Sequence, residues 1–194
     1  MEKITKGITN WLIENGAIED RDAELYEYAI YSIFITISPL LLVFIIGIGM
    51  GTILEGAILI LPFMCIRKFS GGYHANTPGI CLVSSCILLV FCMWLAMHLE
   101  YSYWITIITT ACVVSLCVNS PIDSEHKRLD DMEKRSYKKI ASILSCVFYI
   151  IHCACGCIGL EKIANCLAVG ICLTAILQLP CLYQFHSESR KGTV

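Results

Sequence analysis

The sequence predicts an all-α, polytopic membrane protein. Of its 194 residues, 57% are hydrophobic and only 15% are charged, and the mean hydropathy is +0.71. This composition is far too apolar for a soluble domain of the same length. Several apolar runs reach or approach the roughly 20 residues that a helix needs to cross a bilayer. We therefore expect about six transmembrane helices, preceded by N-terminal interfacial amphipathic helices.

The N-terminal residues predict helices that lie on the membrane surface. Apolar side chains recur there at a helical spacing, with charged residues between them, at Ile4, Ile8, Trp11 and Leu12. A second short helical segment, residues 20–28, is highly charged and leads directly into the first apolar run. The alternative is a soluble cap. We accordingly divide the chain into interfacial helices at 1–28 and a six-helix transmembrane domain at 29–194.

Six apolar runs are candidates for the membrane spans. We place them at residues 29–47, 52–66, 79–99, 101–118, 140–160 and 163–183. The glycine-rich residues 47–51 join the first two runs, and we expect them to permit a turn. The spacing of Gly47 and Gly51 is also typical of closely packed membrane helices.

The basic residues predict the orientation of these spans. With six spans and the N-terminus inside, every Lys and Arg except Lys162 falls on a cytoplasmic segment. Such an excess is characteristic of cytoplasmic loops. We therefore expect a multi-pass protein of the cell membrane, with both termini, residues 67–76 and loop 119–139 on the cytoplasmic side.

Charge and cysteine content exclude other classes of protein. A net charge of −2 offers no basic surplus for nucleic acid, which we do not expect as a partner. The 13 cysteines are scattered through apolar runs, where a thiol packs as a small hydrophobe. A disulfide framework is therefore not expected.

A polar, glycine-rich segment at residues 65–81 holds the candidate chemistry, because it supplies a base, His74, and a thiol, Cys81. Thr77-Pro78 is typical of a helix N-cap followed by proline at the first helical position. This puts Cys81 at about the fourth residue of a helix, where unpaired N–H groups favour a thiolate.

His74 would lie about 10.5 Å from Cys81 along one continuous helix. A chain folded back at Gly71-Gly72 would instead bring the imidazole within hydrogen-bonding reach of the sulfur. The alternative interpretation is a solvated histidine and a cysteine that only packs.

Nearby residues supply further candidates. The backbone N–H groups of Gly71 and Gly72 are possible oxyanion donors, and a simple turn is the alternative. Ser70 and Asp123 are the candidates for a third member of a triad, and the sequence does not decide between them. His152 lies among cysteines, and histidine and cysteine together are ligands for a soft metal ion. Because this segment lies inside a predicted span, we expect neither a metal nor a cofactor.

The stretch from Arg67 to Ala75, followed by Cys81, resembles the signature of the accessory gene regulator B family, the membrane cysteine endopeptidases of Gram-positive peptide quorum sensing. The resemblance extends to residues 19–28, to the number and order of the spans, and to residues 121–123. It implies that His74 and Cys81 are catalytic.

The resemblance also implies a substrate and an assembly. Such proteins cut the C-terminal part from a short amphipathic precursor peptide and close the remainder into a thiolactone or lactone ring, and they work as homodimers in the lipid bilayer. Arg67, Lys68 and the basic loop would then hold an acidic leaving segment of the precursor. A small transporter or channel using Glu55 is the alternative, but it predicts ionisable residues in several spans, and the last four spans carry almost none.

Overall fold

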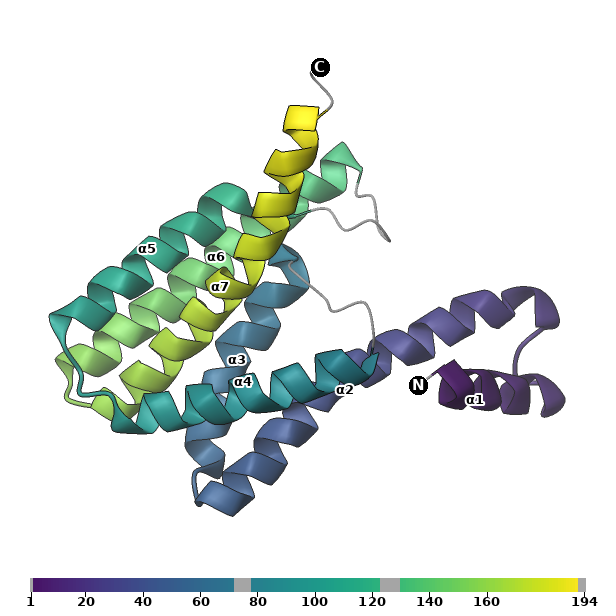
Figure 1. The fold of residues 1–194 in the computed structure, drawn as a ribbon, viewed down its shortest axis with the longest axis horizontal. Helices are drawn as coiled ribbons and strands as arrows, with labels where there is room; N and C mark the ends of the chain where they lie inside the picture. Colours follow the sequence, from purple (N-terminus) through teal and green to yellow (C-terminus); the bar gives the residue numbers. More distant parts are fainter. Residues whose placement is uncertain (1, 72–77, 123–129, 192–194) are drawn as a thin grey trace.

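The computed structural model describes residues 2–71, 78–122 and 130–191, and these are almost entirely helical (Figure 1). The elements are α1 (Glu2–Glu14), a short 3-10 turn η1 (Asp20–Asp22), α2 (Ala23–Met50), α3 (Ile53–Ser70), α4 (Pro78–His98), α5 (Tyr103–Asn119), α6 (Asp131–Cys157) and α7 (Glu161–Lys191). The prediction of an all-α protein is confirmed.

Helices α2 to α7 coincide in order with the six predicted spans. Among the described residues, two helical segments are long and apolar enough to cross a membrane, Met132–Cys157 and Glu161–Cys181. Shorter apolar segments occur at Ile37–Met50, Val83–His98 and Tyr103–Asn119. The six-span topology itself stays a prediction.

The predicted turn between the first two spans is confirmed at Gly51. Its φ is 68°, in the left-handed region that glycine adopts without strain. The Gly51 N–H donates to the Ile48 carbonyl and the Thr52 N–H to the Gly47 carbonyl, a Schellman arrangement that satisfies the last carbonyls of α2. A Cβ on Gly47 would lie only 2.9 Å from Ile53 Cα, so this glycine lets the two helices of the hairpin approach closely.

The N-terminal region differs in one respect from the prediction. Helix α1 forms and packs against α2, but residues 23–28 are the first turns of α2 rather than a separate helix (Figure 1). The predicted boundary at residue 28 therefore falls inside a continuous helix. In α1, Thr5 and Thr9 are buried, whereas Ile4 and Trp11 are exposed.

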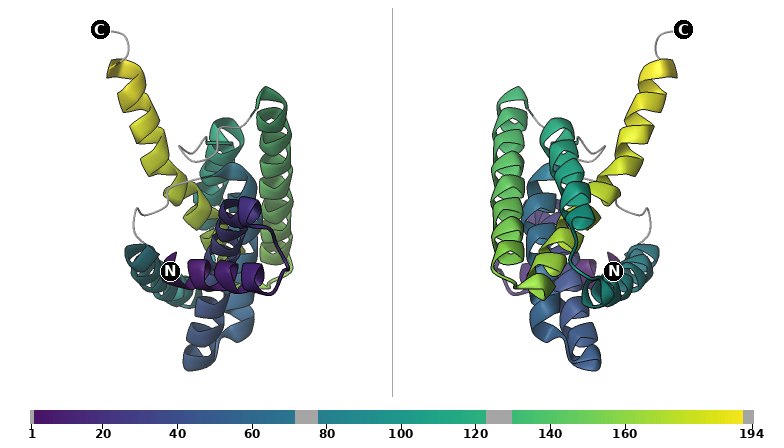
Figure 2. Two further views of the ribbon diagram at one scale, coloured as in Figure 1. Left: turned by 90° about the vertical axis from the view of Figure 1, so that its right-hand side faces the viewer. Right: turned by 90° about the vertical axis from the view of Figure 1, so that its left-hand side faces the viewer.

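Helices α3 and α7 form the centre of the fold, with α4 and α6 on opposite sides of the pair (Figure 2). A Cβ on Gly170 of α7 would lie 2.7 Å from Pro62 Cγ of α3 and would also collide with the Leu59 carbonyl oxygen. Gly170 therefore permits a near-backbone contact between the two helices. Pro62 has no N–H to continue the helical hydrogen bonds at this crossing.

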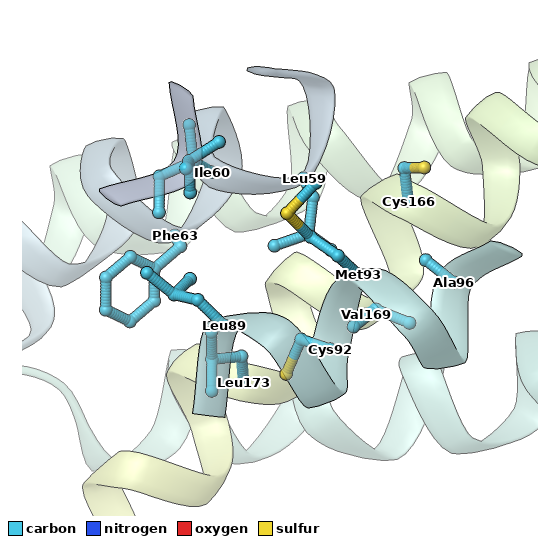
Figure 3. Packing of buried hydrophobic residues seen from close by; sticks show 11 residues of the cluster. Leu59, Ile60, Phe63, Leu89, Cys92, Met93, Ala96, Cys166, Val169 and Leu173 are labelled. Atoms are coloured by element: carbon cyan, nitrogen blue, oxygen red, sulfur yellow. The ribbon is translucent and has the colours of Figure 1, made fainter. Parts of the chain in front are cut away.

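Two hydrophobic clusters flank this central pair. The first joins α3, α4 and α7, and its members are Leu59, Ile60, Phe63, Leu89, Cys92, Met93, Ala96, Cys166, Val169 and Leu173, together with Val43 of α2 (Figure 3). The second joins the other face of α3 to α5, α6 and α7 through residues such as Ile66, Leu116, Phe148 and Ile171. Cys92 and Cys166 lie in the first cluster, as expected of cysteines that pack as small hydrophobes.

Candidate active site

The predicted site begins in the last turn of α3. Arg67 is half-buried, with its guanidinium carbon 5.6 Å from the centre of the Phe63 ring. Lys68 is exposed, with Nζ 5.8 Å from the Phe69 ring centre. Phe69 in turn packs edge-on against Tyr137 of α6, with 5.6 Å between ring centres. Two positive charges at a helix C-terminus interact favourably with the helix dipole.

Ser70 ends α3 and is fully buried. Its carbonyl accepts the Ile122 N–H at 3.0 Å and the Gln178 side-chain amide at 3.3 Å. The same Gln178 nitrogen donates to Ser120 Oγ at 3.2 Å. We call these four residues, Ser70, Ser120, Ile122 and Gln178, the Ser70 clamp. A carbonyl in the last turn of a helix has no partner within the helix, so the clamp meets this need with groups that follow α5 and that lie on α7.

Gly71 turns the chain away from α3. Its φ of 72° and ψ of −166° lie in a region that essentially only glycine occupies. A Cβ at this position would lie 2.6 Å from the Ile122 carbonyl oxygen. The predicted break in the helix is thus present at Gly71. The Gly71 N–H donates to the Arg67 carbonyl at 3.1 Å, as in a turn, and an oxyanion role for it would require that bond to open.

The start of α4 matches the expectation from Thr77-Pro78. Pro78 is the first residue of the helix, so Cys81 is its fourth. His74, Gly72, Thr77 and Asp123 lie outside the described residues, as does the side chain of Cys81. Contact between His74 and Cys81 therefore stays a prediction.

Ser70 and Asp123 were the two candidates for a third catalytic residue. The Ser70 hydroxyl donates to the Gly71 carbonyl at 3.2 Å. The side chain is fully buried and already hydrogen-bonded. These contacts indicate a structural role at the end of α3. Its backbone carbonyl, rather than its hydroxyl, is the group that accepts the hydrogen bonds from Ile122 and Gln178.

A second polar cluster surrounds His152 near the other ends of the helices. Its Nδ1 lies 2.9 Å from the Ala164 carbonyl, and its Nε2 lies 3.4 Å from the Thr106 hydroxyl. Because a carbonyl only accepts, Nδ1 donates its hydrogen to the Ala164 carbonyl. Both ring nitrogens are thus occupied by uncharged partners, an arrangement that fixes α6 to α5 and α7. Within the described ranges no three His, Cys, Asp or Glu side chains gather where they could share a metal ion.

Sequence reasoning overlooked two buried amides on α7, Asn165 and Gln178. Asn165 donates to the Leu99 carbonyl at 2.7 Å and so ties α7 to the connection between α4 and α5. The signal was present, because an amide within an apolar run is costly to bury unless it finds hydrogen-bond partners. What the sequence did not contain was the identity of those partners.

Comparison with known proteins agrees with the resemblance found in the sequence. The family model described as Accessory gene regulator B matches residues 5–179. A putative AgrB-like protein of Clostridium perfringens strain SM101 is 23% identical over 158 residues, which cover 77% of this chain and 74% of the relative. The accessory gene regulator protein B of Staphylococcus lugdunensis is 24% identical over 134 residues, covering 68% of this chain and 69% of that protein.

A putative AgrB-like protein of Clostridium acetobutylicum is 24% identical over 195 residues, covering 99% of this chain and 91% of the relative. No solved structure matches.

Proposed function

Because this chain belongs to the accessory gene regulator B family, we propose that it is a membrane cysteine endopeptidase that cuts and cyclises a short amphipathic precursor peptide for quorum sensing. The observation that carries the proposal is the family match over residues 5–179, which includes the whole segment between Arg67 and Cys81. The start of α4 at Pro78 supports it, since it puts Cys81 in the first turn of a helix.

Cys81 is the nucleophile in this proposal. The first N–H groups of a helix have no partners within it, and they carry the positive end of the helix dipole. Both effects favour the thiolate over the thiol at Cys81. His74 acts as the base that takes the thiol proton.

The reaction proceeds through an acyl-enzyme. Cys81 Sγ attacks the scissile carbonyl of the precursor, the C–N bond breaks, and the leaving amine takes a proton from the His74 imidazolium. This step leaves a thioester between the N-terminal part of the peptide and Cys81. A Cys or Ser side chain of the bound peptide then attacks the thioester, a ring forms, and the Cys81 thiol is regenerated. The thioester preserves acyl activation, so ring closure needs no ATP.

The basic residues around the end of α3 would hold the acidic leaving segment of the precursor peptide. Arg67 and Lys68 are placed at the end of α3, and α6 presents Arg135 and Lys139 on its exposed surface. Lys138 donates to the Val118 carbonyl at 3.3 Å and so also connects α6 to the end of α5. Ordinary cytoplasmic loop composition accounts for much of this charge, which is why we assign substrate contact first to the pair on α3.

In the membrane, we propose six spans with both termini and the site on the cytoplasmic side, and a homodimer as the working unit. A purified, active protein with the mass of one 21.6 kDa chain in nanodiscs would contradict the dimer.

The test of the proposed reaction uses a short amphipathic precursor peptide with a central Cys or Ser and an acidic C-terminal segment, co-expressed with the full chain and followed by mass spectrometry. Cys81→Ala should abolish cleavage, and Cys81→Ser should nearly do so, because a hydroxyl is far less ionised than a thiol. His74→Ala should slow cleavage by about 10²- to 10⁴-fold, the usual effect of losing a general base. As matched controls, Cys86→Ala, Cys92→Ala and Cys155→Ala should keep their activity.

A covalent intermediate provides the second test. When the ring-closing Cys or Ser of the peptide is replaced by Ala, the N-terminal fragment should accumulate as a thioester on Cys81. An adduct on any other cysteine, or cleavage by Cys81→Ala, would contradict the assignment.

A further inference from the structure

We propose that Gln178 of α7 is a positioning residue for this site, acting through the Ser70 clamp to hold the point at which the chain leaves α3. The inference rests on the proposed function. It adds a residue that lies 108 positions beyond Ser70 in the sequence and outside the motif.

The orientation of the Gln178 amide follows from its partners. The Ser70 carbonyl can only accept, so the NH₂ group must face it. That group has two hydrogens, and the structure provides two acceptors, the Ser70 carbonyl and Ser120 Oγ. Both lone pairs of the Ser70 oxygen are then used, one by Gln178 and one by the Ile122 N–H. The amide therefore joins three separate segments of the chain at one oxygen atom.

Burial makes a role in simple packing a poor explanation for Gln178. The side chain is fully buried, and its Oε1 has no hydrogen-bond partner among the described residues. Burying an amide oxygen without a partner costs free energy, about 1–3 kcal/mol in proteins. A leucine would fill similar space without that cost. The two hydrogen bonds donated by Nε2 are what the glutamine contributes instead.

The position of Gln178 allows it to hold the end of α3 in place. The two helices meet at the Gly170 contact with Leu59 and Pro62. Gln178 lies eight residues further along α7, about 12 Å by helical rise, where it meets the last residue of α3. Two anchors at this separation, together with the packing of Ile66 and Phe69, fix the direction of the last turns of α3. A displacement of about 1 Å at reacting atoms is enough to slow a reaction by about 100-fold.

Asn165 provides a matched control on the same helix. It is also a buried amide whose oxygen has no hydrogen-bond partner in the described part of the chain, and its nitrogen also donates to a main-chain carbonyl, that of Leu99. It sits near the start of α7, away from the end of α3. Removing either amide takes away buried hydrogen bonds, two at Gln178 and one at Asn165, but only those of Gln178 reach the end of α3.

The experiment compares Gln178→Met with Asn165→Leu in the full-length protein in nanodiscs. Three quantities are measured: the melting temperature, the processing kinetics of the same precursor peptide, and the rate at which iodoacetamide alkylates Cys81 as a function of pH, resolved by mass spectrometry. We expect both variants to melt at similarly reduced temperatures. Only Gln178→Met should lower kcat, by about 10- to 100-fold with little change in KM, and only it should alter the pH profile of Cys81 alkylation.

Wild-type kinetics in Gln178→Met, or equal losses in the two variants, would overturn the inference. If Gln178→Met fails to accumulate, Ser120→Ala tests the inference instead, because it removes only one of the two hydrogen-bond acceptors of the Gln178 amide. Because the loosened clamp displaces the end of α3, Ser120→Ala should lower kcat by about five-fold, less than Gln178→Met, and an unchanged kcat would count against the clamp. Cleavage by Cys81→Ala would defeat the proposed function itself, whereas an inactive Cys81→Ala beside a fully active Gln178→Met would defeat only the role of Gln178.

Discussion

Replacing Gly71 by alanine tests the geometry at the end of α3 most directly. The backbone there has a φ of 72° and a ψ of −166°, a combination that costs a residue with a Cβ about 1–3 kcal/mol. The new Cβ would also lie 2.6 Å from the Ile122 carbonyl oxygen, so the segment after α5 must move. That movement weakens the bond from the Ile122 N–H to the Ser70 carbonyl, worth about 1 kcal/mol. We therefore expect a total loss of about 2–4 kcal/mol.

Two other glycines separate these contributions. Gly51 has a φ of 68° but no atom within 4 Å of its would-be Cβ, so Gly51→Ala should cost only the left-handed backbone, about 1–2 kcal/mol. Gly49 lies within α2 with an open site and no positive φ, so Gly49→Ala should be neutral or slightly stabilising. From the most to the least stable, the three variants should therefore rank Gly49→Ala, Gly51→Ala and Gly71→Ala.

The assay is thermal unfolding of each purified variant in nanodiscs, followed by tryptophan fluorescence. For a chain of this length, 1 kcal/mol corresponds to a shift of roughly 2–4 °C in melting temperature. Gly71→Ala should then melt roughly 4–16 °C below the wild type, and Gly51→Ala roughly 2–8 °C below it. If Gly71→Ala melted at the same temperature as Gly51→Ala, the close contact with Ile122 would not exist in the folded protein, and the account of the Ser70 clamp would fail.

Three further predictions concern other parts of the chain. A single cysteine introduced at position 125 should resist impermeant thiol reagents in intact cells, because basic loops face the cytoplasm, and labelling from outside would rule out the six-span topology. Replacing Ile8 and Trp11 with Asp should reduce peptide processing but not membrane insertion, because Trp11 is 60% exposed on α1. Asn10→Asp adds one negative charge without removing an apolar side chain and should have little effect; equal processing in both variants would remove the interfacial role. Gly156→Ala should lower stability by about 1–3 kcal/mol, measured by thermal unfolding, because the hydroxyl and the ring carbon Cζ of Tyr101 occupy the space of the added methyl; an unchanged melting temperature would contradict this contact.

Local patterns were sufficient to predict most of the helices. The length of an apolar run sets the length of a membrane helix, so α4, α5 and α7 begin within two residues of their predicted starts. Pro78 begins α4 because its fixed φ and missing N–H suit the first turn of a helix. Gly51 ends α2 for an equally local reason, its left-handed φ. The start of α6 was placed too late, because residues 131–139 are charged and resemble a loop, yet they form a helix.

The connections between segments were not predictable in the same way. Nothing in the neighbourhood of Gln178 indicates that its amide meets Ser70, because that contact depends on how α3 and α7 pack. Similarly, Gly71 was expected to permit a turn, but its close approach to Ile122 depends on where α5 ends. The roles of His74 and Cys81 came from a short motif and its resemblance to a family, and they stay predictions.

The Ser70 clamp also has a consequence for the order in which the protein is made. At a synthesis rate of about 5–20 residues per second, the 108 residues between Ser70 and Gln178 take roughly 5–20 s to add. A nascent chain therefore contains the entire segment from Arg67 to Cys81 for several seconds before the last helix reaches it. During that interval the end of α3 lacks its glutamine donor, so the hydrogen bonds of the Ser70 clamp are complete only after α7 has packed beside α3.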